Sequence, residues 1–320
     1  MNTFLATALY KILSVLVSLV LFLSPLSAPA PDDPIRRGDG VRLSAALWSD
    51  THMSDYLFSR VKNVKASVLD LAAAEGLDAL VIDGDITENG KPQEFRLMAD
   101  ELAKLSNVGH IIPASGNHDI RLRNFNMTVK TFSEFCETVN PAIRTDKLYY
   151  SYEVNGYTFI VLGSTETVFE EAAVSDGELA FLDASLAAAT ADGKPAFVLL
   201  HQPLRNTHNL PDAWGSPIPS AGSVGRDSDR LIYVMNKYEN VFLITGHLHS
   251  GLGVNNFEDV GKLHSVNLPS IGIVSKDGGY EAAGTGYVMS VTDDSVVFQA
   301  RNFADGRYLP EYDHSYTLVK

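Results

Sequence analysis

Short apolar runs recur along the chain and alternate with longer stretches whose apolar residues repeat at helical spacing. Runs of the first kind predict buried strands, and the amphipathic stretches predict helices packed on them. The predicted strands are residues 42–48, 79–82, 110–113, 158–162, 196–200 and 241–245. The predicted helices are residues 55–75, 93–105, 129–139, 178–189 and 227–238. This alternation indicates an α/β fold with mainly buried strands.

The pattern changes after Gly251. Residues 263–268, 286–292 and 295–303 also predict strands, but little helical pattern lies between them. Strands that follow one another without helices usually pair in antiparallel fashion. We therefore expect either a second sheet or an antiparallel extension of the first.

No repeat, low-complexity stretch or linker divides residues 41–320, which predicts one domain. Two segments lack a regular pattern, residues 121–127 and 205–226. Long ordered loops in a compact enzyme often line its site, and an ordinary surface excursion is the alternative. Both interpretations stay open for these two loops.

The N-terminus has a different character from the rest of the chain. Lys11 precedes an apolar run at residues 12–23, and small residues and prolines follow. A cationic start, an apolar run and small residues are the parts of an export signal. The alternative is that residues 4–26 stay as a membrane anchor. We expect residues 1–30 to be a signal peptide or anchor and residues 31–40 a linker, in a chain that is extracytoplasmic, either secreted or anchored.

The composition restricts the partners. The 320 residues carry a formal net charge of -14, and no block of Lys and Arg interrupts the acidic background. Binding to a long nucleic acid requires clustered cations that displace counterions, so such a partner is not expected. A small anionic substrate is still compatible, because bound metal ions reverse the local sign of charge. The sequence leaves the oligomeric state open.

Clusters of His, Asp and Asn follow five of the predicted strands directly. The clusters are Asp50-Thr-His52, Gly84-Asp85, Gly116-Asn117-His118-Asp119, His201 and Gly246-His247-Leu248-His249. In α/β sheets the carboxyl ends of the strands collect the functional loops. Five clusters at equivalent strand ends are therefore expected to converge on one place.

Taken singly, most of the clusters have an ordinary structural explanation. Asp50 and His52 are compatible with a helix-capping turn, and a lone histidine such as His201 is more often a core residue. The strongest single motif is His247-Leu248-His249, because two histidines in a turn can bind two different ions. Imidazole, carboxylate and amide donors together suit Mn, Fe, Zn or Co.

The acidic residues near Gly84 offer rival ligands. Asp83 and Glu88 lie close to Asp85 in the sequence. Side chains alternate along a strand, so Asp83 is expected to point away from the side that Gly84 leaves open. Asp85 is therefore the favoured ligand, and its two oxygens are able to bridge two cations.

In this order the five motifs resemble the calcineurin-like metallophosphoesterase superfamily. The resemblance spans about residues 41–255 and includes every motif. It implies a fold of two facing β-sheets flanked by helices, a four-layer αββα sandwich. It also implies a centre of two divalent metal ions, with Mn, Fe or Zn expected.

The resemblance further implies a role for each residue of the motifs. The first metal would be held by Asp50, His52 and His249, the second by Asn117, His201 and His247, and Asp85 would bridge them. His118 would act as general acid or oxyanion stabiliser, and we expect Asp119 to orient its ring. Purple acid phosphatases of this superfamily have a tyrosine ligand three residues after the bridging aspartate, where this chain has Glu88. The iron–tyrosinate form is therefore not expected.

These features predict an exported dinuclear phosphoesterase. It would hydrolyse a small phosphate mono- or diester through a metal-bridging hydroxide, with His118 protonating the leaving oxygen. Two alternatives come from other classes. A cell-surface binding or scaffold protein with a relict site predicts missing ligands, whereas all seven are present. A metal-dependent nuclease would use the same centre, but the acidic surface disfavours it.

Overall fold

The computed structural model describes residues 33–167 and 169–320. The predicted signal peptide or anchor lies outside the described residues. Within the described ranges, no helix has both the length and the apolar character that a membrane span requires.

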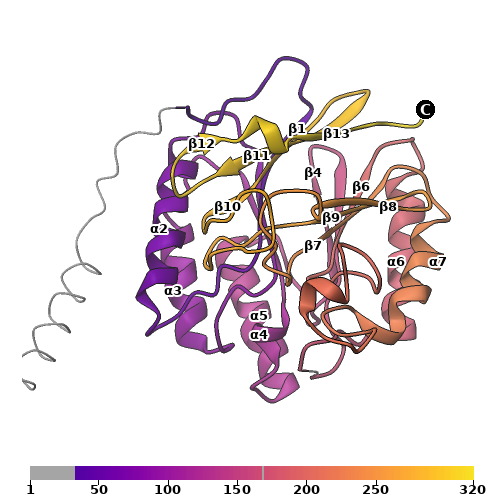
Figure 1. Cartoon of the computed structure of the whole chain (residues 1–320), viewed down its shortest axis with the longest axis horizontal. Coiled ribbons are helices and arrows are strands. Elements are labelled where there is room, and N and C mark those ends of the chain that lie inside the picture. The colour runs from indigo at the N-terminus through magenta and orange to yellow at the C-terminus, as the bar shows by residue number, and fades with distance from the viewer. Residues whose placement is uncertain (1–32, 168) are drawn as a thin grey trace, which may run out of the picture.

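The first sheet is built from both ends of the described chain (Figure 1). Its strands are β1 (Leu43–Trp48), β2 (Ala79–Asp83), β3 (His110–Ala114), β10 (Thr285–Val291), β11 (Ser295–Asn302), β12 (Arg307–Tyr308) and β13 (His314–Thr317). They lie in the order β12-β11-β10-β1-β2-β3, and β13 also pairs with β11. The β1–β2 and β2–β3 pairs are parallel, while β1–β10 and β10–β11 are antiparallel. The sheet is thus a parallel half joined to an antiparallel extension.

The second sheet comes from the middle of the chain. Its strands are β4 (Tyr150–Val154), β5 (Tyr157–Val161), β6 (Ala196–Leu199), β7 (Val241–Thr245), β8 (Phe257–Val260) and β9 (Leu263–Asn267). The order is β4-β5-β6-β7-β9-β8. Strands β5, β6, β7 and β9 are parallel, and β4 and β8 form antiparallel edges. The strands after Gly251 therefore contribute to a second sheet and also extend the first. Strands β8 and β9 belong to the second sheet, and β10–β13 extend the first.

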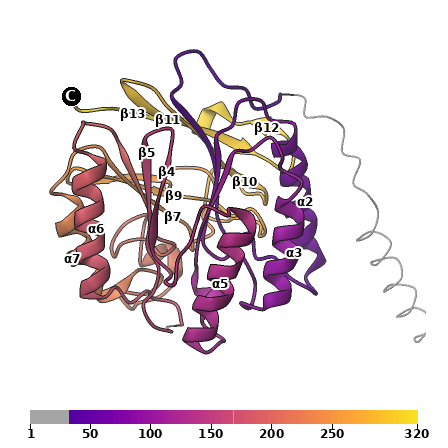
Figure 2. The same cartoon turned by 180° about the vertical axis from the view of Figure 1, so that it is seen from behind.

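The helices cover the two outer faces (Figures 1 and 2). On the side of the first sheet lie α2 (Phe58–Ala72), α3 (Pro92–Leu102), the short α4 (Asn117–Ile120) and α5 (Phe125–Val139). On the side of the second lie α6 (Asp176–Ala189) and α7 (Ser228–Met235). The result is the expected four-layer sandwich of helices, sheet, sheet and helices.

The two sheets face each other across a common apolar core. Trp48 and Tyr287 of the first sheet belong to the same buried cluster as Phe197 and Phe242 of the second. A separate cluster, which includes Leu182 of α6, lies between the second sheet and its helices. Strands buried on both faces read as continuous apolar runs, which is why periodicity alone locates them.

The structure confirms all six strands predicted before Gly251 and all five predicted helices, with ends that shift by a few residues. One predicted loop is wrong in part, because residues 125–127 belong to α5. The side chain of Asn124 accepts hydrogen bonds from the backbone N–H groups of Asn126 and Met127, so it caps the helix earlier than the apolar pattern indicates. Strand β4 was not predicted, since its partly exposed residues lack an apolar run.

Candidate metal centre

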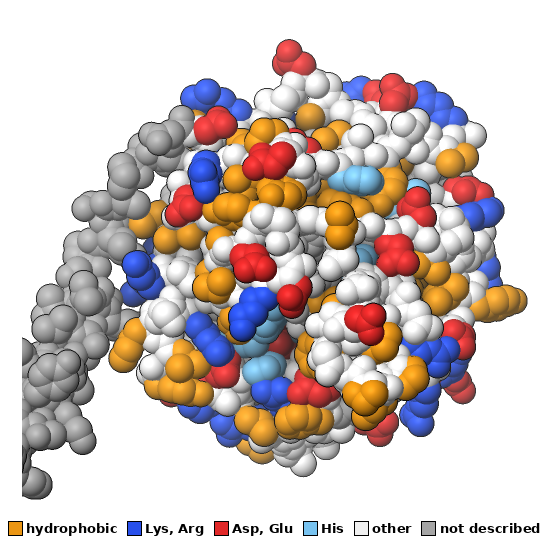
Figure 3. All heavy atoms as spheres, viewed as in Figure 1, with side chains coloured by type: hydrophobic (Ala, Val, Ile, Leu, Met, Phe, Trp, Pro, Cys, Tyr) orange, Lys and Arg blue, Asp and Glu red, His pale blue; other side chains and the backbone are white. Residues whose placement is uncertain are grey.

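The seven candidate ligands come together at the carboxyl ends of strands from both sheets. Asp50 and His52 follow β1, Asp85 follows β2, Asn117 follows β3, His201 follows β6, and His247 and His249 follow β7. Figure 3 shows histidine side chains at the surface near the middle of this face, bordered by acidic and basic side chains. The sandwich therefore brings two independent sets of strand ends to one place.

Among the described residues, two groups of donor atoms share one carboxylate, and a third group, His52, Glu88 and His118, adjoins the first through His52. Asp50, His52, Asp85 and His249 each offer an atom within 4.8 Å of the others, and so do Asp85, His201 and His247. Asp85 belongs to both groups, as a bridging ligand must. Asp83 belongs to neither group, as the alternation along β2 predicts.

Individual distances within the first group suit ligands of one ion. The Nε2 atoms of His52 and His249 lie 3.2 Å apart. His249 Nε2 lies 2.9 Å from Asp50 Oδ1, and His52 Nε2 lies 3.6 Å from Asp85 Oδ2. In the second group His201 Nε2 lies 3.3 Å from the same Asp85 oxygen. Atoms that bind one ion at about 2.0–2.2 Å lie about this far apart.

Several buried donor atoms of the centre have no hydrogen-bond partner among the described residues. They are His201 Nε2, His247 Nε2 and Asn117 Oδ1. An unpartnered polar atom in the interior costs about 1–3 kcal/mol. Three such atoms in one place are accounted for when they bind cations, so the residues fit a metal centre.

Hydrogen bonds outside the centre fix how the ligands point. The Asp83 carbonyl accepts from His201 Nδ1 at 2.8 Å, and Glu88 accepts from His52 Nδ1 at 2.9 Å. Each bond leaves Nε2 of the same ring directed at the centre. Ser49 Oγ donates to Asp50 Oδ2 at 2.6 Å, and the His247 N–H donates to the same oxygen at 3.1 Å, which leaves Oδ1 to face His249 Nε2.

The backbone at the ligands is strained. Five of the seven candidate ligands have a left-handed φ: Asp50 (52°), His52 (44°), Asp85 (44°), His247 (73°) and His249 (51°). Side chains other than glycine rarely adopt this conformation, and it concentrates at functional sites. Sharp turns of this kind direct consecutive side chains into a small volume.

Two glycines make the close approach of these turns possible. A Cβ atom at Gly84 would overlap the ring of His201, and one at Gly116 would overlap the carboxylate of Asp85. Gly84 also has a φ of +78°. Any larger residue at either position would therefore displace a candidate ligand.

Electrostatic effects within the centre are strong because its groups are buried. Burial disfavours the charge on Asp50, but the His249 and His201 rings outweigh burial and hold the pKa of Asp50 well below its usual range. The pKa of Asp85 is lowered in the same way, mainly by His201. Burial opposes the charge on His201, yet Asp85 and Asp50 raise its pKa to about 10. The carboxylates therefore stay ionised and stabilise positive charge placed beside them.

Comparison with known proteins agrees with this geometry. The family model for calcineurin-like phosphoesterase matches residues 44–251, which is more than half of the chain and spans all seven candidate ligands. This chain belongs to the calcineurin-like phosphoesterase family. It is thus a metal-dependent phosphoric ester hydrolase of a family that uses dinuclear metal centres.

Individual relatives are distant. A glycerophosphodiester phosphodiesterase, GpdQ, of Enterobacter lignolyticus is 26% identical over 212 residues, which cover 63% of this chain and 69% of the relative. A dimetal phosphatase from Danio rerio has a TM-score of 0.58 at 14% identity, covering 87% of this chain and 100% of the other. A purple acid phosphatase from yellow lupin has a TM-score of 0.61 at 14% identity, covering 86% of this chain and 53% of the other. The two structures show that the fold is shared.

In this phosphoesterase the predicted partnership of His118 and Asp119 is wrong. The Asp119 carboxylate accepts from the backbone N–H groups of Gly116 and Thr87, at 2.9 Å each, and from Thr87 Oγ1 at 2.7 Å. It therefore ties the turn after β3 to the turn after β2. Adjacent residues in the short helix α4 point in different directions, which separates Asp119 from the His118 ring.

The His118 ring is oriented by a carbonyl group instead. Its Nδ1 donates to the Glu88 carbonyl oxygen at 2.8 Å, and its Nε2 lies 3.9 Å from Asp85 Oδ2. The ring packs edge-on against His52, with centroids 4.5 Å apart. Burial lowers the pKa of His118 to about 3, and nearby cations such as Arg121 add to this effect. The ring is therefore neutral at pH 7 and has one nitrogen directed at the centre.

Several residues around the phosphoesterase centre were not assigned a role from the sequence. Glu88 contacts both His52 and Arg60 of α2. Trp214, in the long 205–226 loop, stacks on the ring of His247 with centroids 4.5 Å apart and 20° between the planes. The length of that loop was the feature of the sequence that indicated a role at the site. The structure confirms that the loop lines the centre, through Trp214.

Glu170 is the most informative of the missed residues. It lies in the loop between β5 and α6, and its carboxylate contacts Asn117 and Arg121. Burial raises its pKa, and Arg121 opposes that rise. No motif in the sequence marks this loop, because the residues around Glu170 have no metal-ligand pattern.

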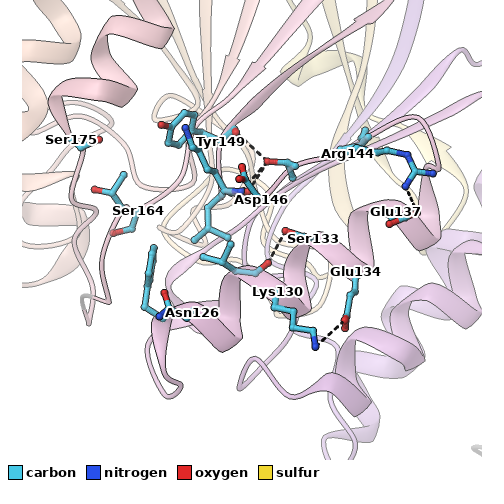
Figure 4. A pocket seen from close by; sticks show the side chains of 17 residues that line it. Asn126, Lys130, Ser133, Glu134, Glu137, Arg144, Asp146, Tyr149, Ser164 and Ser175 are labelled. Atoms are coloured by element: carbon cyan, nitrogen blue, oxygen red, sulfur yellow. Dashed lines mark hydrogen bonds and ion pairs between the residues drawn. The ribbon is translucent and has the colours of Figure 1, made fainter.

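A cavity of about 660 Å³ lies outside the centre, between α5 and residues 143–149 (Figure 4). None of the candidate ligands lines it. Its charged side chains include the ion pairs Lys130–Glu134 and Arg144–Glu137 (Figure 4). Neither its lining nor its charges suit a metal-dependent reaction, so we place the chemistry at the strand ends.

Proposed function

We propose that this protein is an exported phosphodiesterase that acts on small diesters. The observation that carries the proposal is the pair of donor groups that share Asp85. Two metal ions that share a carboxylate ligand can stabilise both the attacking and the leaving oxygen of a phosphoryl group.

The proposed ligands follow the two donor groups. Asp50, His52 and His249 hold the first ion, and His201 and His247 hold the second together with the amide oxygen of Asn117. Asp85, which belongs to both groups, would be their shared ligand. When bound, the ions supply an activated water and offset the charge that develops on the phosphoryl oxygens.

The protein itself orients the substrate and handles the proton. His118 Nε2 faces the centre, so we assign it the contact with the leaving oxygen. Its Nδ1–H is held by the Glu88 carbonyl, so only Nε2 is free to exchange a proton with the substrate. The arriving negative charge of the phosphate raises the pKa of His118 and favours its protonated form.

Charge supports a diester as the substrate. Two divalent ions and the two carboxylates of Asp50 and Asp85 leave the centre positive. The arginines beside it, Arg60 and Arg121, are already paired with Glu88 and Glu170. A monoanionic diester needs less compensation than a dianionic monoester, and the GpdQ relative is named as a glycerophosphodiester phosphodiesterase.

A substrate panel tests the proposal. The full chain is assayed with glycerophosphodiesters, an aryl phosphodiester and an aryl phosphomonoester, with Mn²⁺ or Zn²⁺ added and metal content measured alongside. We expect kcat/KM for the diesters to exceed that for the monoester by at least about tenfold, which corresponds to about 1.4 kcal/mol. A preference for the monoester, or turnover that survives complete chelation, contradicts the proposal.

Export has its own test. We propose that residues 1–30 direct the protein out of the cytoplasm, because they combine a lysine, an apolar run and small residues. Fusion of this segment to a reporter, followed by fractionation and N-terminal sequencing, distinguishes cleavage from retention in the membrane. A reporter that stays in the cytoplasm overturns the proposal.

A further inference from the structure

The loop between β5 and α6 lies directly against the second metal site. Asn117 Nδ2 donates to the Phe169 carbonyl oxygen at 3.3 Å and to Glu170 Oε2 at 3.1 Å. Asn117 is fully buried, and its Oδ1 has no hydrogen-bond partner among the described residues. The two ends of this amide therefore have opposite surroundings.

The orientation of that amide decides whether Asn117 is able to bind a cation. Only the oxygen of an amide group has a lone pair for a metal ion, whereas the NH₂ group repels it. Two acceptors on the side of Phe169 and Glu170 hold the NH₂ group there, and the oxygen is directed the opposite way. Without them nothing among the described contacts distinguishes the two orientations.

The loop that supplies these acceptors is itself attached to the site. Arg121 Nη1 donates to Glu170 Oε1 at 3.1 Å, and the Arg121 guanidinium lies over the Phe169 ring, 4.9 Å from its centroid. Gln202 follows the candidate ligand His201, and its Nε2 donates to the carbonyl oxygens of Glu170 at 3.1 Å and Glu171 at 3.3 Å. Arg121 thus holds the carboxylate of Glu170, and Gln202 holds the backbone of the loop that carries it.

Glu170 lies beside the second metal site but is not one of its candidate ligands. Its Oε2 is 4.0 Å from His247 Nε2, but Glu170 is not part of either donor group within 4.8 Å. The first site is oriented differently, through Ser49 and Glu88, which come from the turns after β1 and β2. Within the described part of this loop, the contacts of Phe169 and Glu170 reach Asn117 and His247 of the second site.

We propose that Glu170 is a positioning residue that orients the Asn117 amide and so sets the affinity of the second metal site. This inference rests on the ligand assignment of the proposed function and does not depend on the substrate. It makes occupancy of the second site dependent on a surface loop, while the first site depends on the core.

The test is a metal titration of the full chain by calorimetry, after removal of metal, with Mn²⁺ as the probe. In Glu170→Ala we expect the affinity of the second site to fall about 10–100-fold, the usual effect of losing an orienting partner, and the affinity of the first to stay unchanged. Glu170→Gln keeps an acceptor oxygen and should lose less than tenfold. Excess Mn²⁺ should restore kcat in Glu170→Ala, which loss of folded protein would not allow.

Matched variants keep the outcome interpretable. Glu166→Ala removes an exposed carboxylate of the same loop that pairs with Arg226, and this variant should bind both ions as the unaltered protein does. Glu170→Asp keeps the charge but shortens the reach, so it should weaken the second site even if Glu170→Ala fails to fold. Unchanged affinity at both sites in folded Glu170→Asp or Glu170→Ala, or equal weakening of both sites, overturns the inference.

Failure of the substrate proposal would give a different result. If the protein binds two ions, and Glu170→Ala weakens only the second, the inference stands even when no diester is hydrolysed. If the unaltered protein binds no more than one ion, the assignment of Asn117 is wrong and the inference is overturned with it.

Discussion

Two buried clusters of charge in this molecule use similar residues in opposite ways. At the metal centre, buried carboxylates and histidines converge with donor atoms left unpartnered and with a left-handed backbone. Between α2 and β11, Asp70 accepts two hydrogen bonds from Arg301, at 2.7 and 2.6 Å, and both residues are buried. The Arg301 guanidinium also lies over the Tyr308 ring.

The difference teaches how to distinguish function from stability in a buried ionic cluster. The Asp70–Arg301 pair joins charges of opposite sign in a bidentate contact, so its charges balance within the protein, although Arg301 Nη1 has no hydrogen-bond partner among the described residues. The metal centre gathers acceptors that face one another, as His52 and His249 do, and it needs cations from outside. One cluster should therefore affect mainly stability and the other mainly activity.

The largest effect is expected from removal of the shared carboxylate charge. Asp85→Asn should lower kcat/KM for an aryl phosphodiester by about a thousandfold, because two ions lose their common ligand. The melting temperature in chelator should fall as well, since His201 stabilises the ionised carboxylate in the folded protein. A variant that keeps more than about a tenth of the activity would falsify the bridging role of Asp85.

The second effect concerns stability alone. Asp70→Ala leaves the Arg301 guanidinium buried without its partner, and it should lower the free energy of unfolding by about 3–5 kcal/mol, measured in urea. Activity per folded molecule should be unchanged. The double variant Asp70→Leu with Arg301→Met serves as the control and should recover part of the loss. A cost below about 1 kcal/mol would mean that the pair contributes no more than a surface ion pair.

Metal binding offers a third contrast. Mn²⁺ at a hundred times its Kd should stabilise the unaltered protein by about 2.7 kcal/mol per site, because the ions bind only the folded state. Asp70→Ala should gain the same increment from its lower starting point, whereas Asp85→Asn should gain less. Thermal melts with and without Mn²⁺ provide the measurement. Equal gains in all three proteins would remove the distinction between the clusters.

The smallest effect on stability is expected from Glu178, a buried carboxyl group that forms no ion pair with another described residue. Burial raises the pKa of Glu178 in α6 to about 8, although it accepts a hydrogen bond from the Gly163 N–H. The folded state therefore binds a proton more tightly than the unfolded state does. Stability from this group is present at low pH and is lost as the pH rises from the unfolded value of about 4.3 towards 8.

Glu178→Gln keeps an acceptor for Gly163 without the titrating group. Its stability, measured by urea unfolding from pH 5 to pH 8.5, should decline less with pH than that of the unaltered protein. Asp183→Asn, on the same helix but with a half-exposed carboxylate, is the matched control and should leave the decline in place. Identical slopes for Glu178→Gln and the unaltered protein would show that Glu178 ionises without cost.

Local sequence patterns were sufficient to locate most of the framework. Strands such as β1 and β7 are mostly apolar runs, and Asp50 and His247, which follow within two residues of the strand ends, mark where the site begins. Strand β4 was missed because its side chains are partly exposed and follow no apolar run. Helix α5 begins early because the Asn124 side chain caps it, an effect of hydrogen bonding that apolar periodicity does not contain.

The sequence by itself determined the ligand inventory, the strand ends that carry it and the family, because these depend on residue types and short spacings. Only the tertiary structure decided that the ligands of β1, β2 and β3 meet those of β6 and β7, since they lie in different sheets. It also assigned Asp119 to a turn, His118 to the Glu88 carbonyl and Glu170 to Asn117. The His118 and Glu170 contacts join residues far apart in the chain, so their geometry exists only once the strands have paired and the two sheets have packed together.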